Sequence, residues 1–179
     1  MQNYYEKMVR RVWRFPDYFR AALIVAAAMI VIAIAVFAAW SGMLVKYGLT
    51  MLAPIFAVGA VVGAWYVIGT MRIEYEYNYF NGELDLDVIT AKRRRRRVAT
   101  VDVRSFEEFG KYSDLGKTKQ QLKNDYDKRW FMCSAPENPD CYYAVLRHEH
   151  KLTLLVFEPS EEMLSEMRSV APRLFRQRG

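Results

Sequence analysis

Two long runs of apolar residues constrain this chain more than any other feature of its sequence. The first extends from Ala21 to Trp40 and the second from Leu49 to Met71, and neither contains a charged residue. A helix of about 20 apolar residues crosses a hydrocarbon layer of about 30 Å. Only Ser41–Gly48 separates the runs, so we predict an antiparallel transmembrane hairpin. A cleavable signal peptide is the alternative for the first run, but the run is too long and no small-residue cleavage site follows it.

The charges around the hairpin predict its orientation. The connecting turn carries one cation, Lys46, and the segment after the second run begins with Arg72. The segment before the first run carries five cations: Lys7, Arg10, Arg11, Arg14 and Arg20. By the positive-inside rule, both termini are predicted to be cytoplasmic. Because neither run contains a charged residue, an ion pathway is not indicated, and we interpret the hairpin as an anchor.

The rest of the chain has the polarity of a soluble domain. Ile73–Tyr79 and Leu84–Val88 alternate large apolar residues with polar ones, which predicts two half-buried strands. Asn81-Gly82 lies between them and suits a type I′ hairpin turn. The polar stretch 110–128 is interpreted as a long loop with some helical character. Further strands are predicted over 98–103, 130–134, 142–147 and 152–157.

The end of the chain changes to a helical period. Ser160 is a suitable N-cap, and Met163, Met167 and Leu174 lie near helical spacing on one apolar face, while Pro172 is expected to end the helix. A run of antiparallel strands closed by one amphipathic helix predicts an α+β domain, with an antiparallel sheet or barrel capped by a C-terminal helix. That is the layout of a pleckstrin-homology-like domain. The predicted organisation is a basic cytoplasmic flank (1–20), the hairpin (21–71) and the cytoplasmic pleckstrin-homology-like domain (72–179).

Two blocks of sequence resemble a known family. EYEYNYFNGELDLDVITAKRRRRR, from Glu74, and LLVFEPSEEMLSEMRSVAPRLF, from Leu154, are similar to domain-of-unknown-function family 6106. The resemblance covers nearly the whole chain and is weakest over 110–128. It implies a small protein of the bacterial cytoplasmic (inner) membrane, with two membrane helices and a pleckstrin-homology-like body. It supplies no biochemical activity that can be carried over to this chain.

The run of cations from Lys92 to Arg97 is the strongest candidate binding feature. Like charges in sequence repel one another, so they need open water or a polyanion nearby. In a strand, alternate side chains would point to opposite faces of the sheet. The anionic cytoplasmic leaflet is the favoured partner, at about 1 kcal/mol for each cation near it. The candidate residues for binding lipid or another anion are Arg72, Lys92, Arg93, Arg94, Arg95, Arg96 and Arg97.

Three other interpretations of the basic run remain open. The charges could protect an exposed edge strand from aggregation, bind the phosphates of a nucleic acid, or meet an acidic protein surface. Nucleic acid is the less favoured partner. The nearby carboxylates Glu83, Asp85 and Asp87 are interpreted either as a solvated face or as partners for the arginines.

The remaining chemistry-bearing residues do not form a recognisable site in the sequence. His148-x-His150 has two candidate metal ligands in a turn, without a clear third. Cys133 and Cys141 are expected to be reduced thiols, and the strand spacing does not require them to meet the histidines. No phosphate-binding loop, nucleophile elbow or zinc-protease motif occurs. We therefore predict no catalytic residue, no metal and no cofactor.

These features favour a non-enzymatic, membrane-anchored binding or scaffolding module that docks on anionic lipid or on a protein partner. The alternative is a structural or regulatory subunit of a membrane protein complex, held there by packing of the two helices. Steep weakening by salt would distinguish docking by exposed cations from helix packing.

Overall fold

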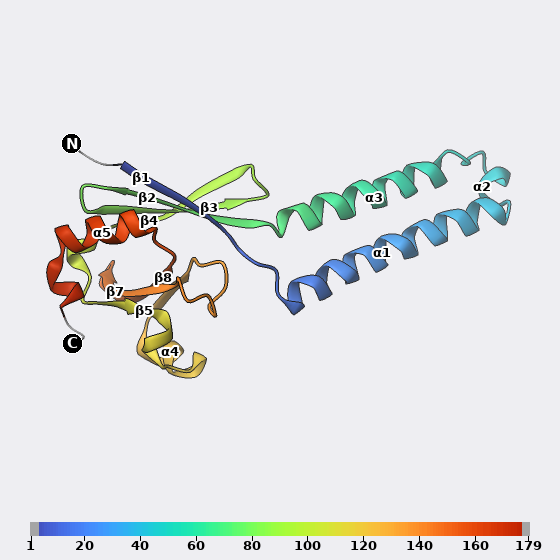
Figure 1. The fold of residues 1–179 in the computed structure, drawn as a ribbon. Coiled ribbons are helices and arrows are strands. Elements are labelled where there is room, and N and C mark those ends of the chain that lie inside the picture. The colour runs from blue at the N-terminus through green and yellow to red at the C-terminus, as the bar shows by residue number, and fades with distance from the viewer. Residues whose placement is uncertain (1–3, 177–179) are drawn as a thin grey trace. The chain divides into compact units, whose positions relative to one another are not determined.

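The computed structural model describes residues 4–176, which fall into two compact units (Figure 1). One unit is helical and comprises Trp13–Arg72. The other contains the β-strands and is built from the chain on both sides of the helical unit, residues 4–12 and 73–176. The helical unit is therefore an insertion within the sequence of the β unit.

The helical unit is a hairpin of two long helices. Helix α1 is Phe15–Trp40, the short helix α2 is Met43–Lys46, and helix α3 is Leu52–Thr70. Both α1 and α3 are long and apolar enough to cross a membrane. Of the most apolar 18-residue stretch of each helix, only 6% is buried in α1 and 0% in α3. A core helix of a soluble protein would bury such side chains, so this exposure fits helices that face lipid.

The boundaries of the two long helices differ from those of the apolar runs. Helix α1 begins at Phe15 rather than Ala21, because Pro16 suits a first turn and the Asp17 carboxylate accepts the N–H of Arg14 at 3.1 Å. Helix α3 is three residues shorter than the second run at its start, after the left-handed Gly48 (φ 66°).

The first sheet of the β unit has four antiparallel strands in the order β1-β2-β3-β4. The strands are β1 (Tyr4–Arg10), β2 (Ile73–Phe80), β3 (Glu83–Thr90) and β4 (Arg94–Asp102). The predicted β2–β3 hairpin is confirmed: both Asn81 (φ 48°) and Gly82 (φ 90°) have positive φ, as a type I′ turn requires. Strand β4 starts within the arginine run instead of at Val98.

Strand β1 corrects the expectation that residues 1–20 form a flank. Tyr4–Arg10 pairs along its whole length with β2, and Val9 is buried in the core. The sequence signal was weak because Lys7 stands between Tyr5 and Val9 on the inner face. The pairing also argues against a cleaved signal peptide, since cleavage after α1 would remove a strand of the sheet.

The second sheet has the order β5-β7-β8-β6. Strands β7 (Tyr142–His148) and β8 (Lys151–Phe157) form the predicted hairpin, and β5 (Glu108–Lys111) pairs with β7. Strand β6 (Lys128–Phe131) pairs with β8 in parallel, which the sequence did not predict. The short 3-10 helices are η1 (Val103–Ser105), η2 (Tyr112–Leu115) and η3 (Pro172–Phe175).

The main core lies between the two sheets and is closed by helix α5 (Glu161–Val170) (Figure 1). Ser160 caps α5 as predicted, its hydroxyl accepting the N–H of Met163 at 3.2 Å. The helix buries an apolar face against the sheets, consistent with its amphipathic sequence. The core includes Tyr75, Tyr77, Tyr79, Leu84, Leu86, Phe157, Met163 and Met167.

A second apolar cluster lies on the other face of the second sheet. Helix α4 (Lys119–Asp125) contributes Leu122, which packs with Tyr143, Val145, Leu154 and Val156. Both faces of β8 are therefore covered, which explains why its sequence is almost continuously apolar. The stretch 110–128, interpreted as a long loop with some helical character, supplies the end of β5, then η2 and helix α4, so its helical character is confirmed.

Candidate functional site

The basic run forms one end of the first sheet. Lys92 and Arg93 lie in the β3–β4 turn, where Ala91 and Lys92 have positive φ (56° and 57°). Residues 94–97 are in strand β4, and every cation from 92 to 97 is exposed.

The strand register places this turn at the end of the sheet where the chain continues into the helices. Ile73 pairs with Thr90, and Thr90 pairs with Arg94. At the same end, Arg10 pairs with Glu74, and the N–H of Arg11 donates to the carbonyl of Ile73 at 3.0 Å. The sheet end thus gathers cations from β1 and from β4, and Arg72 immediately precedes Ile73 in the sequence.

One face of β4 is neutralised by carboxylates of the neighbouring strands. Arg95 donates to Asp87 at 2.8 Å and also to Glu76. Arg97 lies 3.0 Å from Asp85 and 3.4 Å from Asp87. The side chains of Glu76 and Asp87 are only 5% and 2% exposed, whereas those of Arg95 and Arg97 are 53% and 58% exposed. The arginines therefore cover buried carboxylates, and the bond to Asp87 raises the pKa of Arg95.

The same layer extends across β2 to β1. Arg10 lies 2.9 Å from Glu74, the Tyr4 hydroxyl donates to Asn78 at 2.8 Å, and the Asn78 amide donates to Glu76 at 3.1 Å. The outer face of this sheet thus carries polar side chains that are paired across the strands. Of the two interpretations of the carboxylates, partnership with the arginines is correct for Asp85 and Asp87, while Glu83 is exposed.

The other cations of the run have no such partners. Within residues 4–176, no carboxylate lies at ion-pair distance from Lys92, Arg93, Arg94 or Arg96. Arg94 and Arg96 point to the opposite side of β4 from Arg95 and Arg97, as the strand alternation predicts. The turn and this side of the strand therefore present uncompensated positive charge, which is what an anionic surface would bind.

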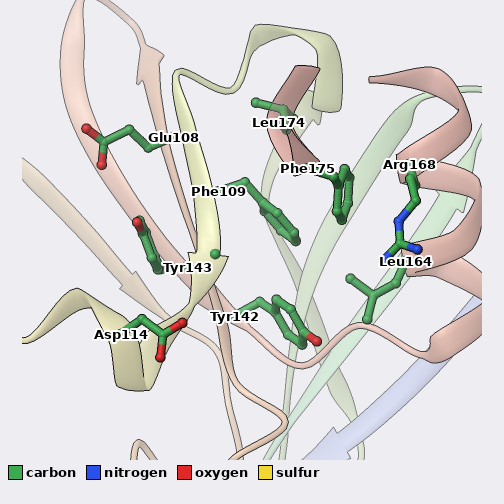
Figure 2. Close-up of a pocket in the computed structure, with 10 residues that line it drawn as sticks. Glu108, Phe109, Asp114, Tyr142, Tyr143, Leu164, Arg168, Leu174 and Phe175 are labelled. Atoms are coloured by element: carbon green, nitrogen blue, oxygen red, sulfur yellow. The ribbon is translucent and has the colours of Figure 1, made fainter. Parts of the chain in front are cut away.

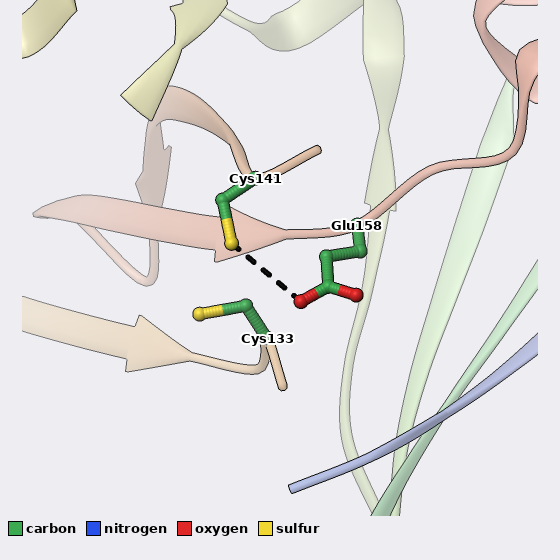
Figure 3. Close-up of side chains that lie close together, drawn as sticks. All are labelled: Cys133, Cys141 and Glu158. Carbon is green, nitrogen blue, oxygen red and sulfur yellow. Dashed lines mark hydrogen bonds between the residues drawn. The ribbon is translucent and has the colours of Figure 1, made fainter. Parts of the chain in front are cut away.

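The cysteines converge on a group that the sequence did not indicate. Cys133, Cys141 and Glu158 are all buried, and their potential ligand atoms lie within 4.8 Å of one another (Figure 3). The histidines lie elsewhere: His148 packs against Trp130 with the ring centroids 5.1 Å apart, and His150 is exposed in the β7–β8 turn. The convergence depends on the parallel pairing of β6 with β8, and strand spacing alone gave no signal for that pairing.

A hollow of about 380 Å³ lies beside β5 and α5 (Figure 2). Phe109 is at its centre, with ring centroids 5.5 Å from Tyr142 and 5.0 Å from Phe175. The Arg168 guanidinium lies over the Phe175 ring at 5.2 Å. The aromatic rings pack mainly against each other, so we interpret the hollow as a shallow surface depression beside the core.

Comparison with known proteins agrees with this architecture. The family model described as Bacterial PH-like domain (DUF6106) matches residues 1–177. The match includes β1 and the helical insertion as well as the strands that follow. No curated protein and no solved structure matches the chain. PH-like domains are generally non-enzymatic, and the match supports a binding or scaffolding module.

Proposed function

Because the chain belongs to the bacterial PH-like domain family DUF6106, we propose that it is a membrane-anchored binding module whose β3–β4 turn docks on an anionic lipid surface. The observation that carries this proposal is the division of charge along one strand. Arg95 and Arg97 are held by the sheet's own carboxylates, whereas the cations of the turn and of the opposite side of β4 have no carboxylate partner among residues 4–176.

The expected strength follows from the number of these cations. Lys92, Arg93, Arg94 and Arg96 would each contribute about 1 kcal/mol near an anionic leaflet, or about 4 kcal/mol together. That corresponds to roughly a thousandfold preference for an anionic over a neutral surface. Arg95 and Arg97 add less, since the carboxylates beneath them offset their charge.

The chain connections favour such docking. Residues 11–14 join β1 to α1, and Met71 and Arg72 join α3 to β2. An extended chain covers about 3.5 Å per residue, so both connections are short tethers. If α1 and α3 span the bilayer, the tethers keep the basic end of the sheet at high local concentration beside it. By the positive-inside rule, the surface concerned is the cytoplasmic leaflet of the bacterial inner membrane.

Flotation of the β unit with lipid vesicles tests the proposal. A fragment that begins at Arg72 would lack β1, so the test protein joins Arg11 to Ile73 through an Asn-Gly turn in place of the hairpin. Its circular dichroism and cooperative melting are checked first. We expect flotation with vesicles of phosphatidylcholine mixed with phosphatidylglycerol, none with phosphatidylcholine alone, and loss at high salt.

A matched pair of variants separates local contact from net charge. Arg94→Gln/Arg96→Gln should weaken binding roughly 30-fold, from the loss of about 2 kcal/mol. Lys119→Gln/Lys123→Gln removes the same charge from exposed positions on α4, which packs on the second sheet, and should change binding less than threefold or so. Equal effects of the two variants, or no flotation of the folded protein at low salt, would reject lipid docking. The second result would favour a subunit of a membrane protein complex, in which this surface meets a protein.

A further inference from the structure

Cys133, Cys141 and Glu158 lie close together, where strands β6 and β8 end and strand β7 begins (Figure 3). Cys133 follows β6, Cys141 immediately precedes β7, and Glu158 immediately follows β8. The three residues are 5%, 1% and 5% exposed, and neither cysteine is in a disulfide.

The sheet register fixes this convergence. Strand β8 lies between β6 and β7, with Phe131 opposite Val156 and Tyr142 opposite Phe157. Because β6 is parallel to β8 and β7 is antiparallel to it, the end of β6 and the start of β7 flank the end of β8. The pairing of the three strands therefore brings the two ends of the β6–β7 loop, and with them both thiols, close to the Glu158 carboxylate.

The surrounding hydrogen bonds orient the carboxylate. The backbone N–H and the hydroxyl of Ser134 both donate to Oε1 of Glu158, each at 2.6 Å. The amide of Asn138 donates in turn to the Ser134 hydroxyl at 3.1 Å. The Cys141 thiol lies 3.1 Å from the carbonyl of Ala135 and 3.6 Å from Oε1 of Glu158. Such second-layer bonds are what hold metal ligands in place in proteins.

We propose that Cys133, Cys141 and Glu158 bind a thiolate-preferring divalent cation of the zinc class. In a tetrahedral zinc site, with sulfur at about 2.3 Å and oxygen at about 2.1 Å, neighbouring sulfur and oxygen ligands are about 3.6 Å apart. The distance between the Cys141 sulfur and Oε1 of Glu158 has this value, 3.6 Å. Two sulfurs and one carboxylate favour zinc over magnesium or calcium, and the fourth position is left for water.

Binding of the cation releases the protons of the thiols that coordinate it. Without a cation, the hydrogen bond with Cys133 and burial raise the pKa of the Cys141 thiol. Each thiol that coordinates loses its proton to solvent as a sulfur–metal bond forms. The affinity should therefore rise with pH, by up to about a hundredfold per pH unit where two protons are released.

A bound cation would restrain the β6–β7 loop. The carbonyl of Ser134 accepts the N–H of Val12 at 3.0 Å, and the Tyr77 hydroxyl donates to the carbonyl of Met132. The loop that holds Cys133 is thus bonded to the residue at which β1 continues toward α1. Metal binding should slow hydrogen exchange in residues 132–141 and at Val12 together.

Cobalt binding to the full-length chain tests the proposal. The protein is purified in detergent, reduced, stripped of metal and titrated with Co²⁺, a spectroscopic substitute for zinc. We expect one Co²⁺ per chain, with tetrahedral d–d bands and a thiolate-to-cobalt charge-transfer band, and displacement of both by Zn²⁺. Cys133→Ser and Cys141→Ser should each weaken binding at least about a hundredfold, and Glu158→Gln about 10–100-fold.

The control variant removes the other candidate ligands. His148→Ala/His150→Ala should leave the cobalt spectrum unchanged, because these residues lie outside the cluster. Circular dichroism of each variant shows whether it is folded. The proposal fails if folded, reduced protein gives no charge-transfer band, or if the band survives in Cys133→Ser/Cys141→Ser. It also fails if the protein isolated without reductant lacks reactive thiols and is lighter by the mass of two hydrogen atoms, which would identify a disulfide instead.

Discussion

Strand β4 carries the same residue on both of its sides, and the two sides differ completely in their surroundings. Arg95 and Arg97 cover the buried carboxylates of Glu76 and Asp87. Arg94 and Arg96 have no carboxylate partner in the described part of the chain. A run of identical cations therefore contains two sets with different physical roles, one that completes the sheet and one that is available for binding.

The difference follows from the residues opposite each side. On the outer face, β2 and β3 present Glu76, Asp85 and Asp87, so an arginine there has a fixed partner. On the other side, Arg96 is opposite Val88 and Arg94 is opposite Thr90, which provide no charge. The alternation of the strand, together with its register against β3, thus separates arginines that are paired with carboxylates from arginines that are not.

The largest expected effect is on stability, from removing the paired arginines. Arg95→Gln/Arg97→Gln leaves buried carboxylates without cationic partners, so we expect the free energy of opening of this sheet to fall. Arg94→Gln/Arg96→Gln should change it by less than about 0.5 kcal/mol. Hydrogen exchange of the β2–β4 peptides in the full-length chain measures both. Similar losses in the two variants would show that the two sides of β4 do not differ in the way described.

A smaller effect is expected from the carboxylate side of the same network. Asp87→Asn keeps the shape of the side chain but removes the charge shared by Arg95 and Arg97, which should destabilise the sheet by about 1–2 kcal/mol. The matched control is Glu83→Gln, an exposed carboxylate on the same strand, with an effect below about 0.5 kcal/mol. If Asp87→Asn destabilised the sheet no more than Glu83→Gln does, the ion pairs of Asp87 would contribute as little to stability as exposed surface ion pairs do.

Much of this architecture could be predicted, because it depends on local patterns. The alternation of Tyr75, Tyr77 and Tyr79, the Asn81-Gly82 turn and the Ser160 cap each specify a local conformation, and the structure has each of them. The apolar runs likewise appear as helices α1 and α3. The family resemblance is confirmed by the match over residues 1–177.

The features that could not be predicted depend on contacts between distant segments. Strand β1 lies next to β2 although the whole helical insertion separates them in the sequence. The approach of Cys133 to Cys141 and Glu158 depends on the parallel pairing of β6 with β8. The assignment of Arg95 and Arg97 to buried carboxylates required the register of β3 against β4, including its irregularity between Leu86 and Asp87.

The smallest expected effect comes from the β3–β4 turn, and it separates stability from docking. Ala91 and Lys92 adopt positive φ, which disfavours residues with a Cβ, whereas the β2–β3 turn has the better suited Asn81-Gly82. Ala91→Asn/Lys92→Gly should therefore stabilise the sheet by about 0.5–1 kcal/mol in the same exchange measurement. Because it also removes one uncompensated cation, flotation with anionic vesicles should weaken about fivefold. A stabilised sheet that docks less well is the result expected if Lys92 serves binding rather than the turn. Unchanged docking would remove Lys92 from the lipid-binding set and leave Arg93, Arg94 and Arg96 to account for it.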